Sequence, residues 1–151
     1  MTNILLYSIL IPVITAIMMN GIIYTFGINK QNDKSIINPL LPSGYIIGSI
    51  WIIIFGLLGY VHYLLYKLKN GISFTSLFLI FVILFCIAYP LITRLKQKSG
   101  LLLNLITLIL AFILGILVII ESKYIFLYIV PLILWATYVN AAYVIQCSEF
   151  Y

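Results

Sequence analysis

The sequence predicts an all-α integral membrane protein: a single domain, residues 1–151, folded as a bundle of five transmembrane helices. The first observation is composition. Hydrophobic residues make up 65% of the chain and charged residues only 7%, with a mean hydropathy of +1.25, whereas about a quarter of a soluble domain is charged. The second is length, because apolar runs of about twenty residues recur, enough for a helix to cross about 30 Å of hydrocarbon. Strands of a membrane barrel would instead give shorter, alternating segments.

The five helices are expected at residues 4–26, 43–66, 72–93, 101–120 and 124–147. Charged residues gather in the breaks between these runs, where Asn70-Gly71 and Ser99-Gly100 also supply turn-forming pairs. The first run lacks a basic start and a small-residue cleavage site. We therefore expect it to remain in the mature protein rather than act as a secretory signal.

The distribution of Lys and Arg predicts the orientation of this multi-pass protein. The side that holds the carboxyl terminus carries Lys30, Lys34, Arg94, Lys96 and Lys98. The opposite side carries Lys67, Lys69 and Lys123. Because basic loops favour the cytoplasmic side, the carboxyl terminus is expected to face the cytoplasm. The basic residues that flank the apolar runs also account for the net charge of +5. We therefore expect contact with membrane lipid and no nucleic acid partner.

Polar chemistry is sparse. The chain has one histidine, His62, and three acidic residues, Asp33, Glu121 and Glu149. No metal-ligand cluster and no carboxylate pair or nucleophile triad can be assembled from these, so we expect no catalytic residue, no metal site and no enzyme activity. The five apolar runs hold no Asp, Glu, Lys or Arg, which argues against an ion-coupled pump. The class of function that remains is the binding of an apolar molecule.

The second apolar run has a chemically varied face. Read at 100° per residue, one side of the helix carries Gly44, Gly48, Trp51, Phe55, Gly59 and His62. The opposite side carries Ile46, Ile50, Ile53, Leu57 and Leu64, which suits contact with lipid. We expect the varied face to look inward. The Gly44/Gly48 pair would let another helix approach closely, either within the bundle or across a homodimer, and we favour the role within the bundle because the pair shares the face of Trp51.

The fifth run has a comparable stripe, formed by Pro131, Trp135, Tyr138, Val139 and Ala142. Two aromatic walls could hold a planar ligand between them through offset or edge contacts. The alternative is that both stripes are ordinary helix packing, since aromatic residues at helical spacing often belong to a core. The residues alone leave both interpretations open.

Several motifs resemble one known family. Asn38-Pro39 and Pro42-Ser43-Gly44 precede the second helix, Trp51 and Phe55 follow at the spacing of a tryptophan and an aromatic, and Leu58-Gly59 leads to Leu64. Pro90-Leu91-Ile92 in the third helix and Pro131 to Trp135 in the fifth are the other similar patches. Together they resemble the translocator protein and tryptophan-rich sensory protein family, also known as peripheral benzodiazepine receptors.

The resemblance implies a pocket inside the five-helix bundle that opens toward the first loop and takes porphyrins or flat aromatic drugs. The expected ligand-binding residues are Pro42, Trp51, Phe55, Trp135, Tyr138 and Val139. No cofactor is required, and protoporphyrin IX or haem is expected as a ligand. The resemblance also implies a homodimer.

Three functions follow from the resemblance. The first is a receptor or translocator that senses, stores or transports porphyrins or other planar lipophilic molecules. The second is an enzyme-like, light-driven breakdown of porphyrin, which is disfavoured because only Trp51 and Trp135 of the family's tryptophans are present. The third is a membrane scaffold that has lost ligand binding.

Overall fold

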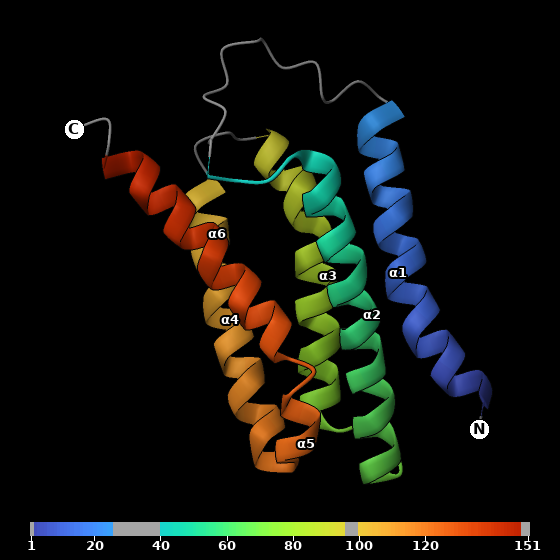
Figure 1. The fold of residues 1–151 in the computed structure, drawn as a ribbon. Coiled ribbons are helices and arrows are strands. Elements are labelled where there is room, and N and C mark those ends of the chain that lie inside the picture. Colours follow the sequence, from blue (N-terminus) through green and yellow to red (C-terminus); the bar gives the residue numbers. More distant parts are fainter. Residues whose placement is uncertain (1, 26–39, 96–99, 149–151) are drawn as a thin grey trace.

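Five long helices form the bundle (Figure 1). The computed structural model describes residues 2–25, 40–95 and 100–148, with side chains for residues 3–22, 25, 40–89 and 100–145. The helices are α1 (Thr2–Thr25), α2 (Gly44–Lys69), α3 (Phe74–Leu95), α4 (Gly100–Glu121) and α6 (Val130–Ser148), with a short α5 (Lys123–Phe126) before α6. The described residues contain no strand. The predicted all-α fold with five long helices is confirmed.

Four spans are long and apolar enough to cross a membrane: α1, α2, α4, and the segment formed by α5 and α6. The remaining long helix, α3, has 22 residues and carries no charged residue before Arg94. These lengths meet the requirement of about twenty apolar residues for a transmembrane helix. The chain is therefore a multi-pass membrane protein.

The fifth span is broken, although the sequence predicted one continuous helix over residues 124–147. At the break, the Ile129 amide donates to the Phe126 carbonyl at 2.8 Å and the Tyr128 amide donates to the Ile125 carbonyl at 3.1 Å. Pro131 has no amide hydrogen and so cannot complete an α-helical bond back to residue 127. The chain closes a tight turn there and begins α6 at Val130.

The helices pack largely in chain order. α1 packs along α2, α2 against α3, α3 against α4, and α4 against α6. α1 begins at the end of the bundle opposite to the end where α6 finishes (Figure 1). This is the arrangement that an odd number of spans requires.

The core lies between the helices and the outer surface is apolar. Fully buried side chains come from α2, α3, α4 and the fifth span, among them Leu58, Leu65, Leu79, Leu114 and Leu132. Large hydrophobic side chains are exposed on the outer faces, such as Ile53 on α2, Leu84 on α3 and Ile116 on α4. An outer surface of this kind is suited to lipid rather than water.

The main chains of α1 and α2 approach each other closely at Gly59. A Cβ atom added there would lie 2.8 Å from the Cα of Ile9, so only glycine allows the two main chains to approach this closely. Nearby, the Ser8 hydroxyl and His62 Nδ1 form a hydrogen bond of 3.2 Å. This hydrogen bond is partly buried and joins His62 of α2 to Ser8 of α1.

The role of the Gly44/Gly48 pair in helix packing within the bundle is wrong for the described part of the chain. A Cβ atom added at either glycine would meet nothing within 4 Å. Both glycines instead line the cavity described below. Their lack of side chains provides open volume rather than a helix contact.

Polar side chains connect α2, α3 and α4 at the end of the bundle where α2 and α4 end and α3 begins. Lys69 forms a salt bridge with Glu121, and the Thr75 hydroxyl donates to the same carboxylate at 3.3 Å. The predicted turn at Asn70-Gly71 is present, with Asn70 at a φ of 51°. Asparagine tolerates this left-handed conformation, which ends α2 and directs the chain into α3.

Candidate ligand-binding cavity

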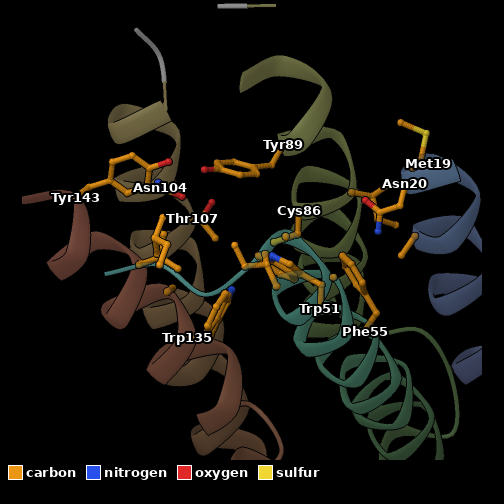
Figure 2. Close-up of a pocket in the computed structure, with 18 residues that line it drawn as sticks. Met19, Asn20, Trp51, Phe55, Cys86, Tyr89, Asn104, Thr107, Trp135 and Tyr143 are labelled. Carbon is orange, nitrogen blue, oxygen red and sulfur yellow. The ribbon is translucent and has the colours of Figure 1, made fainter. Parts of the chain in front are cut away.

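A cavity of about 410 Å³ lies inside the bundle near the end where α1, α3 and α6 finish (Figure 2). Its lining comes from five helices and the segment before α2: Ala16, Met19, Asn20, Leu41, Gly44, Ile47, Gly48, Trp51, Phe55, Cys86, Ile87, Tyr89, Asn104, Thr107, Trp135, Ala136, Val139 and Tyr143. Its volume lies within the range of about 300 to 1,000 Å³ that small-molecule pockets occupy.

The α2 wall is aromatic. Trp51 and Phe55 are one helical turn apart, and their rings stack with centroids 5.4 Å apart and planes at 28°. Phe55 is buried in the core and Trp51 is half-buried at the cavity surface. The buried ring therefore supports the indole, and Gly48 leaves space beside it.

The α6 wall faces the α2 wall with a second indole. Trp135 lies across the cavity from Trp51 in Figure 2. Its ring contacts Tyr138, with centroids 5.6 Å apart and planes at 31°. Ala136 and Val139 complete this wall with small side chains. Each indole is thus backed by a second aromatic ring from its own helix.

One end of the cavity is polar. Asn104 and Thr107 of α4 lie there with Tyr89 of α3 and Tyr143 of α6, and Figure 2 shows the two phenol groups directed toward the Asn104 side. The Thr107 hydroxyl donates to the Leu103 carbonyl at 2.8 Å. Most of the hydrogen-bonding groups of the lining therefore lie at this end, and Asn20 of α1 adds a polar side chain on the opposite side of the cavity.

Buried Asn140 holds the polar end in place. Its side-chain amide donates to the main-chain carbonyl of Asn104 at 3.0 Å and to that of Ala136 at 2.8 Å. The first of these bonds joins α6 to α4 and the second lies within α6. Two of the three helices that carry the polar groups, α4 and α6, are thereby fixed relative to each other.

The lining suits an apolar molecule with a few hydrogen-bonding groups. No Asp, Glu, Lys, Arg or His occurs among the cavity's described lining residues, and the described residues contain no cluster of three or more side chains suited to a metal ion. Apolar pockets with a small number of placed polar groups are typical small-molecule sites.

Four of the six predicted ligand-binding residues are brought together in the lining: Trp51, Phe55, Trp135 and Val139. Tyr138 and Pro42 are not part of it. The Tyr138 side chain is 43% exposed, and its hydroxyl donates to the main-chain carbonyl of Leu40. It fastens the segment before α2 to α6, and in that segment Leu41 rather than Pro42 lines the cavity.

Sequence reasoning missed the polar end. Asn104 and Thr107 are three residues apart in the otherwise apolar fourth run, a spacing that places both on one helix face. Polar residues inside a membrane helix usually face protein or a cavity. That signal was present in the sequence, whereas the convergence of Tyr89 and Tyr143 on the same place depends on how three helices pack.

Comparison with models of known protein families shows to which family the chain belongs. The profile of the TspO/MBR family matches residues 8–145, a range that reaches into all five spans. The chain belongs to the TspO/MBR family. Neither a curated protein nor a solved structure matches it.

TspO/MBR membership confirms the resemblance that the sequence motifs carry, and it suggests a membrane receptor-like or transporter-like function. Of those motifs, Asn38-Pro39 lies outside the described residues and Pro90-Leu91-Ile92 lies in α3 without described side chains. The motifs around Trp51 and Trp135 are the ones that line the cavity.

Proposed function

We propose that this TspO/MBR protein binds porphyrins or other planar lipophilic molecules in its cavity and thereby senses, stores or transports them. One observation carries the proposal. The two tryptophans of the chain, Trp51 on α2 and Trp135 on α6, are 84 positions apart in the sequence and line the same cavity.

Two facing indoles favour a flat aromatic ligand. Aromatic pairs in stacked or edge contact contribute about 0.5 to 1.5 kcal/mol each beyond the burial of their area. The rest of the lining is mostly apolar, and four of its polar side chains, Tyr89, Asn104, Thr107 and Tyr143, gather at one end. A macrocycle with an apolar body and polar groups on one edge fits this distribution.

Two partners complete the proposal. The exposed apolar faces of the helices contact membrane lipid. The protein forms a homodimer, as expected from its resemblance to the translocator proteins. Light scattering of the purified protein with subtraction of the detergent mass measures the dimer, and a monomer mass at every concentration contradicts it.

The binding experiment is a titration of protoporphyrin IX against the protein in lipid nanodiscs, followed by the Soret absorbance. The wild type is expected to show saturable binding near one porphyrin per chain. Trp51→Leu and Trp135→Leu each remove one indole and are expected to weaken binding about tenfold or more, which corresponds to about 1.4 kcal/mol.

Phe112→Leu is the matched control, because Phe112 on α4 is half exposed on the outer face and does not line the cavity. It removes an aromatic ring without touching the proposed site, so its affinity should equal that of the wild type. Binding that does not saturate, or that all three variants weaken equally, contradicts the proposal. If light bleaches the bound porphyrin faster than free porphyrin, the result would favour the enzyme-like alternative.

A further inference from the structure

Asn104 presents an unsatisfied donor at the cavity wall. Its side chain is 5% exposed, and the amide nitrogen Nδ2 has no hydrogen-bond partner within the described part of the protein. Leaving a buried polar group unpaired is unfavourable, and native proteins seldom do so without a reason. The residue also lines the cavity, so a bound molecule can supply the missing acceptor.

The neighbourhood of Asn104 restricts the chemistry of that acceptor. The hydroxyl groups of Tyr89 and Tyr143 lie on the same side of the cavity as the Asn104 amide (Figure 2). No cationic side chain occurs in the described lining, so a full negative charge seated here would be buried without a counter-ion, which is costly. A positive charge would face an amide donor. A neutral oxygen acceptor fits the site best.

We propose that Asn104 determines ligand specificity by donating a hydrogen bond from Nδ2 to a neutral carbonyl oxygen of the ligand. The carbonyl belongs to an ester, a ketone or a protonated carboxyl group on the edge of a planar molecule whose body lies between Trp51 and Trp135. This inference rests on the proposed function and adds to it the class of polar group that the ligand carries.

Asn104→Leu tests the role of the amide with little disturbance of the fold. Leucine has a similar size and carries no hydrogen-bonding group, so it removes the amide donor without introducing another polar group. The bond from Asn140 goes to the main-chain carbonyl of residue 104, so the substitution leaves the connection between α4 and α6 in place. Thr107→Val is the matched control, because Thr107 lines the same end but its hydroxyl already donates to Leu103.

The experiment compares two porphyrins with the full-length protein in nanodiscs. Protoporphyrin IX dimethyl ester carries neutral carbonyl groups, whereas etioporphyrin III carries only alkyl substituents. The readout is the ratio of the two dissociation constants, which cancels general effects on folding. Asn104→Leu is expected to weaken binding of the ester about tenfold, equal to about 1.4 kcal/mol, and to leave etioporphyrin binding unchanged. Thr107→Val is expected to keep the wild-type ratio.

Three results overturn the inference, and they are distinguishable. If Asn104→Leu leaves the ratio unchanged while both porphyrins bind saturably, Asn104 does not read the carbonyl and the proposed function still stands. If Thr107→Val changes the ratio as much as Asn104→Leu does, the effect belongs to general polarity and not to the amide. If neither porphyrin binds the wild type saturably, the proposed function fails and this inference fails with it.

Discussion

Replacing Gly59 with alanine is expected to loosen the contact between α1 and α2. A Cβ atom at this position would lie 2.8 Å from the Cα of Ile9 and 2.9 Å from the carbonyl carbon of Ser8. Both are main-chain atoms, so no side-chain rotation can relieve the overlap and α1 must move as a whole. The polar pair of Ser8 and His62 lies at the same contact and would separate with it.

Gly56, one turn earlier on α2, is the matched control. A Cβ atom added there would lie 3.9 Å from Cγ2 of Val13, an ordinary van der Waals contact. Alanine in place of glycine favours a helix interior by about 0.5 to 1 kcal/mol at either position. Overpacking costs about 1 to 3 kcal/mol and arises only at Gly59. Gly59→Ala should therefore unfold with a free energy about 1 to 3 kcal/mol below that of Gly56→Ala.

The assay is reversible unfolding by dodecyl sulfate in mixed micelles, followed by circular dichroism. Both variants are compared at the same detergent mole fraction, so the difference in free energy isolates the clash from the shared helix preference. Equal stability of the two variants would refute the close main-chain contact at Gly59. A less stable Gly56→Ala would refute it as well.

Further substitutions test other parts of the structure. Gly48→Leu projects a side chain into the cavity, where a Cβ atom meets nothing within 4 Å. It should lower the affinity for protoporphyrin IX about tenfold or more. The control Ile53→Leu, on the exposed face of α2, should leave the affinity unchanged. Equal affinities of the two variants would contradict binding in the cavity. Glu121→Gln removes the ion pair with Lys69. It should lower the free energy of unfolding by less than about 1 kcal/mol, because the Lys69 side chain is 44% exposed and solvent screens the pair. A larger loss of stability, measured in micelles at low and high salt, would contradict a screened ion pair. Ser8→Ala should cost about 0.6 kcal/mol, the average for hydrogen bonds between membrane helices, and no change in the same unfolding assay would show that the α1 hydroxyl contributes nothing.

The spans could be predicted from the sequence because one strong physical requirement sets them. A helix in lipid needs about twenty apolar residues, and charges in the breaks mark where each run ends. The break within the fifth span was harder to foresee. Pro131 is visible in the sequence, but proline is tolerated inside membrane helices, and Pro12 lies inside the uninterrupted α1.

The cavity could be predicted only in part. Trp51 and Trp135 share it because the varied faces of α2 and α6 both look inward, which helix periodicity indicates. Periodicity does not say which stretch of such a face meets a helix and which meets open space. Gly48 and Gly59 lie on one predicted face, yet Gly48 borders the cavity and Gly59 contacts α1. The neighbours of Asn104 likewise depend on the rotation of α3 and α6.

The most direct test of one shared binding site uses tryptophan fluorescence quenching by protoporphyrin IX. The chain has two tryptophans, so Trp51→Phe leaves only Trp135 as reporter and Trp135→Phe leaves only Trp51. If both indoles line one porphyrin site, both variants should show saturable quenching, with dissociation constants that agree within about threefold, or about 0.65 kcal/mol. Quenching that rises without saturation in either variant, or two widely different constants, would contradict a single site between Trp51 and Trp135.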